Sequence, residues 1–201
     1  MTRKSKTAAE LLAELQRSPE FAAQKKWREG QDDQRLHELH KEQMQLLSEL
    51  KNLGISISSV WDLVNSKENY SVAIPILVCH LSFPYSASVK EGIVRALTVD
   101  YAGSEALRQL VQEFRKQNDD SETSMKWVLG NAIATAARSS DADTLISLAT
   151  DPSQGKARDM IISALPNVVK DKVRLDVILH RLMSDEEVKE FAHRARLDLK
   201  H

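Results

Sequence analysis

The sequence contains few of the residues that interrupt helices, form disulfides or ligate metals through sulfur. Its 201 residues include one cysteine, 6 glycines and 5 prolines. One cysteine excludes an intrachain disulfide framework and any metal site that takes two thiolates from one chain. No apolar run approaches the roughly 20 residues of a membrane helix. The basic start at residues 1–6 leads into Ala8-Ala9-Glu10 rather than an apolar stretch, which argues against a secretory signal. We therefore expect a cytoplasmic protein without a membrane span.

An excess of charge of one sign is also missing. The chain has 28 basic and 29 acidic residues and a formal net charge of -1. A near-zero net charge argues against a protein that binds nucleic acid mainly through phosphate contacts. With 42% hydrophobic and 28% charged residues, the composition is that of a soluble globular domain.

Helices are the structure that this composition favours. Aromatic residues make up only 5% of the chain, helix breakers are few, and apolar residues recur at steps of three and four nearly throughout. The run at residues 55–57 alternates, but it is too short to indicate a strand. The predicted fold class is all-α.

The first third of the chain is more polar than the rest. We expect a short helix at 8–16, a long polar helix from about 19 to 52 that ends at Gly54, and a short helix at 60–64 whose Trp61 enters the core. Gly30 is the expected point of a break or kink. A narrow stripe on the long helix favours packing on the rest of the chain, with dimerisation through this N-terminal helix as the alternative. The stripe consists of Leu36, Leu39, Gln43, Leu46 and Leu50.

From about residue 70 the chain repeats itself. The segments 89–97, 125–133, 157–165 and 188–196 align without gaps. The second position is always basic and the eighth is always alanine. The basic residues are Lys90, Lys126, Arg158 and Lys189, at intervals of 36, 32 and 31 residues, which is the range of repeats built from helix pairs.

Each aligned segment is preceded by a loop and a second apolar helix. The earlier helices are expected at 73–81, 106–114, 144–149 and 175–182. The loop serines expected to cap the later helices are Ser86, Ser121, Ser153 and Ser184. The predicted unit is therefore helix, short loop, helix, four times over.

The pattern basic-x-x-apolar-x-x-Ala resembles the HEAT-repeat family, in particular its short bacterial form related to phycobilisome-lyase-type repeats. The loops Phe83-Pro84 and Asp151-Pro152 also fit, and the resemblance covers residues 70–199. It implies an α-solenoid of about four helix pairs at 70–201, preceded by an N-terminal helical extension or cap at 1–69. Arg196 stands where the family has Leu or Ile, as expected for a terminal repeat whose outer face meets water.

The resemblance implies that the later helices line a concave surface, with positions three and seven of each segment facing the groove. We call these positions the second-helix strip. The residues proposed to bind a partner are Glu91, Arg95, Trp127, Asn131, Asp159 and Arg194, and Ser163 and Glu190 complete the two columns. Tryptophan and arginine dominate interface hot spots. The alternatives are that Trp127 is core and that the charges form a solvated face with pairs such as Glu91–Arg95.

Other candidate sites are weaker. In similar repeats the basic position pairs with acidic loop residues and carbonyls, so we favour a structural role for it over a ligand site. His37 and His40 lie three apart with Glu42 nearby, a pattern that is more typical of a polar helix surface than of a zinc site. Cys79 is expected to be buried, and Cys79-His80 point to different helix sides and form no nucleophile–base pair. No catalytic, metal or cofactor motif is predicted.

The hypothesis that follows is a non-catalytic scaffold that binds a protein partner through the strip and the loops at 83–85 and Tyr101. A DNA-binding or DNA-base-acting HEAT-like protein is one alternative, but Glu91, Asp159 and Glu190 in the central column would repel phosphate. An immunity-type protein, or a lyase- or chaperone-like helper, is the other alternative.

Overall fold

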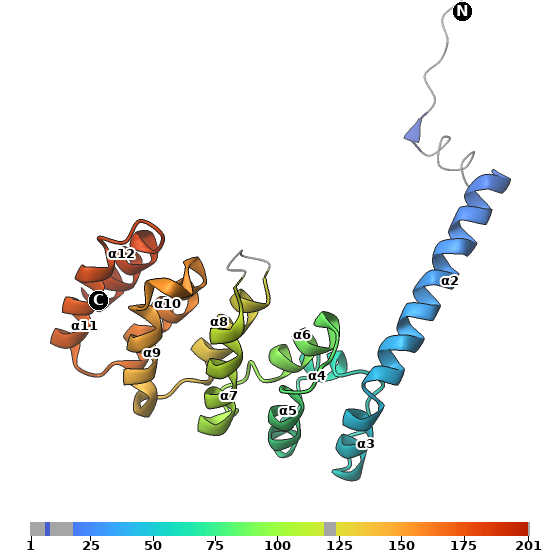
Figure 1. Ribbon diagram of the computed structural model, residues 1–201, viewed down its shortest axis with the longest axis horizontal. Coiled ribbons are helices and arrows are strands. Elements are labelled where there is room, and N and C mark those ends of the chain that lie inside the picture. Colours follow the sequence, from blue (N-terminus) through green and yellow to red (C-terminus); the bar gives the residue numbers. More distant parts are fainter. Residues whose placement is uncertain (1–6, 9–17, 119–123, 201) are drawn as a thin grey trace, which may run out of the picture. The chain divides into compact units, whose positions relative to one another are not determined.

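The computed structural model describes residues 7–8, 18–118 and 124–200, and within them the regular elements are all helical (Figure 1). The predicted all-α class is confirmed. The chain divides into two units, the first ending at Glu42 and the second beginning at Gln43. The helix expected at 8–16 falls, except for Ala8, outside the described residues.

The first unit contains the helix α2 (Pro19–Glu42). Ser18 precedes the helix, and its Oγ accepts a hydrogen bond from the backbone N–H of Phe21 at 3.5 Å. The helix continues through Gly30, so the expected break at this glycine is wrong. Charged neighbours along the surface, such as the Lys25–Glu29 pair at 3.8 Å, are of the kind that supports an exposed helix. No described side chain of α2 is buried.

The long helix is interrupted at Gln43, and α3 (Met44–Asn52) starts at the next residue. Gln43 is only 3% exposed, and its Oε1 accepts a hydrogen bond of 2.9 Å from the backbone N–H of Val60. A buried amide that satisfies a distant backbone donor fixes the chain at this point. Gly54 ends α3 with a φ of 84°, a left-handed conformation that glycine adopts readily, as predicted.

The predicted leucine stripe is divided between the two units. Leu46 and Leu50 on α3 are fully buried, whereas Leu36 on α2 is 63% exposed. The expectation that the stripe packs on the rest of the chain is therefore confirmed for α3 and wrong for Leu36.

Residues 43–69 pack with the repeats inside the second unit. Helix α3 contacts α5 (Ile74–His80), and the short α4 (Trp61–Val64) contacts α6 (Ala87–Ala96). A Cβ on Gly92 of α6 would lie 2.5 Å from Val60 Cγ1 and 3.1 Å from Trp61 Nε1, so only glycine allows this approach. The boundary between the two units lies between residues 42 and 43, within the N-terminal extension predicted at 1–69.

Four further helix pairs follow α3 and α4, at the predicted places. The remaining helices are α7 (Gly103–Lys116), α8 (Met125–Ala136), α9 (Ala142–Ala149), α10 (Asp159–Val168), α11 (Lys172–Leu182) and α12 (Lys189–Leu197). The short 3-10 turns are η1 (Ser71–Ala73), η2 (Ser139–Asp141), η3 (Pro152–Gln154), η4 (Lys156–Arg158) and η5 (Asp198–Lys200). Within the second unit, the later helices of consecutive pairs contact one another in the order α4, α6, α8, α10, α12, and the earlier helices do so from α3 through α5 to α7 (Figure 1).

Small residues allow the later helices to approach one another closely. The repeated alanines at position eight are at most 7% exposed; they are Ala96, Ala132, Ala164 and Ala195. Gly130 serves the same purpose on α8, since a Cβ there would lie 3.1 Å from the carbonyl oxygen of Ala157. The repeat pattern thus predicted the packing face correctly.

The predicted serine caps are only partly present. Ser86 occupies the N-cap position of α6 without a capping hydrogen bond from its side chain, and Ser121 lies outside the described residues. Ser124 caps α8 by accepting from Trp127 N–H at 3.2 Å. The predictions for Ser153 and Ser184 are wrong, because α10 and α12 begin after Arg158 and Val188. Aspartate side chains accept hydrogen bonds from the loop amides instead. Asp151 accepts one from the Ser153 N–H at 3.0 Å, and Asp185 accepts one from the Glu187 N–H at 3.1 Å.

The last pair carries a polar contact where the earlier pairs are apolar. Arg196 of α12 donates two hydrogen bonds to the carboxylate of Asp176 on α11, at 2.6 and 3.1 Å. The corresponding residues of the earlier repeats are buried; they are Leu97, Ile133 and Leu165. The Arg196 side chain is 30% exposed, as expected for a repeat whose outer face meets water.

Candidate functional site

The first half of the second-helix strip lies on α6 and α8, which contact each other. Glu91 and Arg95 are half-buried and form an ion pair within α6, with Arg95 Nε 2.8 Å from Glu91 Oε1. The predicted intrahelical pair is confirmed. Trp127 in the first turn of α8 is half-buried, and so is Asn131 one turn later. Trp127 is therefore neither fully buried nor fully exposed.

On α10 the strip differs from its prediction. Asp159 is only 2% exposed, so its assignment to an exposed binding surface is wrong. Its Oδ1 lies 2.5 Å from the backbone nitrogen of Met160, at the first turn of α10, where a carboxylate interacts favourably with the helix dipole. Ser163 is exposed, and its Oγ donates to the Asp159 carbonyl at 2.9 Å.

The strip ends on α12 beside a hollow of about 470 Å³. Glu190 and Arg194 from the strip line this hollow, and Met183 and Leu197 supply apolar surface. Arg194 also lies over the Phe191 ring, with 5.8 Å between its guanidinium carbon and the ring centroid. Met183 and Leu197 were not among the predicted residues. No signal in the repeat alignment pointed to these two residues.

The basic position of each repeat has a structural role on three of the four later helices. Lys90 Nζ lies 3.6 Å from Glu113, a buried carboxylate on α7 that also pairs with Lys116 at 2.6 Å. Lys126 is 3% exposed, and its ammonium lies 5.1 Å from the centroid of the Phe114 ring. Lys189 is exposed and pairs with Glu186. The expected pairing with acidic loop residues and carbonyls is confirmed at Arg158, whereas Lys126 contacts an aromatic ring.

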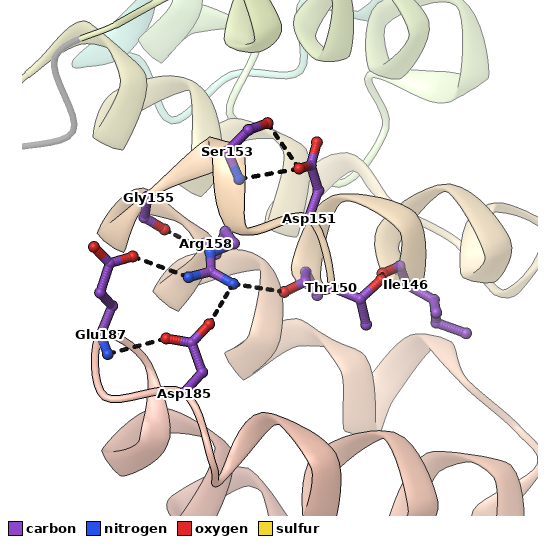
Figure 2. A network of polar contacts seen from close by, with 9 residues as sticks. Ile146, Thr150, Asp151, Ser153, Gly155, Arg158, Asp185 and Glu187 are labelled. Atoms are coloured by element: carbon purple, nitrogen blue, oxygen red, sulfur yellow. Dashed lines mark hydrogen bonds and ion pairs between the residues drawn. The ribbon is translucent and has the colours of Figure 1, made fainter.

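Arg158 is the most strongly bound member of this basic column. Its guanidinium lies 2.9 Å from Asp185 and 3.1 Å from Glu187 in the loop between α11 and α12 (Figure 2). Its Nε donates to the carbonyl of Gly155 at 2.6 Å, and its Nη1 donates to that of Ala149 at 3.5 Å. The residue is 0% exposed. One buried cation thereby joins the α9–α10 loop to the α11–α12 loop.

The predicted partner-binding loop at 83–85 is held by a buried histidine. His80 on α5 is fully buried, and its Nε2 lies 3.1 Å from Glu49 on α3 while its Nδ1 lies 2.6 Å from the Tyr85 hydroxyl. A neutral imidazole satisfies both contacts, because one ring nitrogen donates to the carboxylate and the other accepts from the hydroxyl. The Phe83 ring lies tilted against the His80 ring and the Tyr85 ring lies nearly parallel to it, with centroids 4.5 and 5.9 Å away. These contacts hold the aromatic loop against α5.

This cluster predicts a specific acid dependence of stability. The hydrogen bond from Gln45, followed by that from His80, lowers the pKa of Glu49 below its ordinary value of 4.5. A carboxylate with a lowered pKa contributes stability above the unfolded pKa, and the contribution is lost as pH falls through the folded pKa. The melting temperature of the Glu49→Gln variant should therefore lie below that of the wild type at pH 7, and the two should converge below about pH 4. A gap that stays constant from pH 7 to pH 3 would contradict the assignment.

Tyr101, the second predicted contact loop, packs edge-on against Tyr70 with ring centroids 5.7 Å apart. The Tyr70 hydroxyl donates to the carbonyl of Ala96 at 2.9 Å, and burial raises the pKa of Tyr70 to about 12. Tyr101 thus lies half-buried against the Tyr70 ring.

The remaining candidates carry no assembled site. Cys79 is exposed, so its predicted burial is wrong. Both ring nitrogens of its helix neighbour His80 already contact Glu49 and Tyr85. His37 and His40 lie exposed on α2. No group of three or more His, Cys, Asp or Glu able to hold a metal ion occurs among the residues described.

Comparison with known protein families, curated proteins and solved structures finds no match to this chain. Among the described helices, none combines the length and the apolarity needed to cross a membrane.

Proposed function

We propose that the chain is a non-catalytic scaffold that binds a protein partner along the second-helix strip, with Asp159 removed from the binding set. The revised set is Glu91, Arg95, Trp127, Asn131, Ser163, Glu190 and Arg194. The observation that carries the proposal is the apolar hollow at the end of the strip. Interfaces are anchored by side chains that enter pockets, with aromatic residues and arginine at the centre and polar residues around them. Trp127 and the hollow beside Arg194 supply two such anchor points.

The proposal includes a HEAT-like solenoid as the frame for the strip. Contacts in chain order among α4, α6, α8, α10 and α12 support this arrangement, as do the buried small residues between them. In a frame of this kind each pair contacts mainly its neighbours, so the strip residues stay in fixed register. Binding would then cost little conformational entropy.

Partner capture with strip variants tests the proposal. The tagged full chain, immobilised and exposed to an extract of its native source, should retain a specific partner that mass spectrometry quantifies. Replacing Trp127 and Arg95 with Ala, or Leu197 with Glu, should reduce the retained partner about tenfold or more, since hot-spot truncation costs at least about 2 kcal/mol. The melting temperatures should stay nearly unchanged, because these side chains are half-buried or exposed.

The matched control is Arg181→Ala, an exposed arginine on α11 outside the strip. It should retain the partner as the wild type does. A large loss of stability for Trp127→Ala would instead assign Trp127 to the core. A salt-dependent shift of duplex DNA that the strip variants abolish would favour the DNA-binding alternative.

A further inference from the structure

A second hollow, of about 380 Å³, lies between α7 and α9, which are the earlier helices of their pairs. Helices α3, α5 and α7 pack against one another in order, whereas α7 and α9 make only marginal contact. The chain enters α9 through the turn η2, and α9 is the shorter helix, from Ala142 to Ala149. A groove therefore follows α7 from Ser104 to Arg115, with Asp141 and Thr144 on its other side.

The α7 side of the groove is apolar at its base and cationic at its edge. Leu107 and Val111 line the base and are only 4% and 7% exposed, and Arg108 and Arg115 are exposed beside them. No ion pair joins Arg108 to any described residue. Arg115 lies close enough to Asp151 to contribute to the lowered pKa of that carboxyl. Among the described residues, Asp141 is the one carboxylate that lines the groove, and it already accepts a hydrogen bond from the backbone N–H of Arg138 at 2.8 Å.

The spacing of the two arginines selects the shape of an occupant. Seven residues along a helix advance about 10 Å and return to nearly the same face. A partner helix lying alongside α7 therefore presents carboxylates seven residues apart at the same interval and on one side. In an extended segment successive side chains alternate, and a separation of about 10 Å corresponds to three residues on opposite faces. A helix matches the arginine pair and an extended segment does not.

We propose that this groove binds an acidic amphipathic helix of a partner protein. Its two carboxylates, seven residues apart, pair with Arg108 and Arg115, and small apolar residues between them rest on Leu107 and Val111. Charge complementarity at an apolar groove gives both orientation and specificity. The groove is formed by α7 and α9, and the strip by α6, α8, α10 and α12, so this site is independent of the proposed strip.

Two labelled synthetic peptides test the proposal with the full-length chain. Each is an alanine-rich helix of about 15 residues, since shorter isolated helices are marginal in water. One carries two glutamates seven residues apart with two leucines between them, and the other carries glutamines in place of the glutamates. At low salt, fluorescence anisotropy should show about tenfold tighter binding of the glutamate peptide. Replacing Arg108 and Arg115 with Ala should abolish that difference without lowering the melting temperature.

A charge exchange and a control variant complete the test. Arg108→Glu with Arg115→Glu should bind a third peptide, with lysines in place of the glutamates, better than the wild type does. Arg181→Ala with Lys172→Ala, at exposed positions of α11, should bind the glutamate peptide normally, and so should Trp127→Ala. The proposal is overturned by equal affinity for the glutamate and glutamine peptides, or by equal loss in the α11 control. Equal competition by a single-stranded oligonucleotide of the same charge overturns it as well, because that result describes a general polyanion surface.

Discussion

Removing both carboxylates that face Arg158, by Asp185→Ala with Glu187→Ala, should lower the free energy of unfolding by about 3–5 kcal/mol. The guanidinium is 0% exposed, and these two side chains are its counter-charges, at 2.9 and 3.1 Å. The variant leaves a buried cation without compensation, and the carbonyls of Gly155 and Ala149 cannot supply an opposite charge. For a chain of this size the melting temperature should fall by roughly 10 °C or more.

The companion variants separate the loss of charge pairing from the loss of side-chain contacts. Arg158→Met removes the buried charge itself and leaves carboxylates that are 26% and 55% exposed and can be hydrated. We expect it to cost less than the double variant, about 1–3 kcal/mol. Adding Arg158→Met to the double variant should therefore recover stability. Urea unfolding followed by circular dichroism measures all three values. If the triple variant is less stable than the double variant, the carboxylates do not stabilise the protein by compensating the charge of Arg158.

Removing residues 1–69 should destabilise the repeats strongly, whereas removing residues 1–42 should hardly affect them. No described side chain of α2 is buried, so the shorter deletion takes away little packing. The longer deletion removes four apolar side chains that are at most 3% exposed: Leu46, Leu50, Val60 and Leu63. Burial of each such side chain contributes about 1.5–3 kcal/mol, partly offset by the entropy of ordering the segment. We expect a net loss of about 4 kcal/mol or more.

The comparison is between chains that begin at residue 43 and at residue 70, measured by thermal unfolding. The longer of the two should melt close to the full-length protein. The chain that begins at residue 70 should melt at least about 10 °C lower than the full-length protein. It should also lose the Glu49–His80 contact that helps to hold the loop at 83–85. Equal melting temperatures for the two would restore the boundary at residues 69 and 70 that the repeat pattern predicted.

The repeat pattern predicted the helix pairs well because periodicity is a local property. A helix returns to the same face every three or four residues, so the aligned apolar and alanine positions identified the buried side of α6, α8, α10 and α12. The ends of the helices were less predictable. Serines were expected to cap α10 and α12, but Asp151 and Asp185 bind the loop amides, since a carboxylate is the stronger acceptor of an N–H.

The candidate site was predicted only in outline. Positions three and seven share a face of the helix, yet Trp127 is half-buried and Asp159 is buried at the same position of the repeat. The position in the repeat specifies a direction from the helix axis. What lies in that direction depends on the neighbouring loop, and the loop differs from one unit to the next. The hollow at Met183 and Leu197 and the groove along α7 likewise depend on how neighbouring helices pack against one another, which no repeat alignment records.

The sequence by itself determined the all-α class, the four helix pairs and the buried small-residue face, because composition and periodicity act within single helices. Tertiary structure decided the rest. It placed residues 43–69 with the repeats and buried Arg158 against Glu187, 29 residues away. It also placed two of the few glycines, Gly92 and Gly130, where neighbouring segments pack closely. Each of these outcomes depends on the contact between one helix pair and the next. That contact is set by side chains far apart in the sequence, and local periodicity does not encode it.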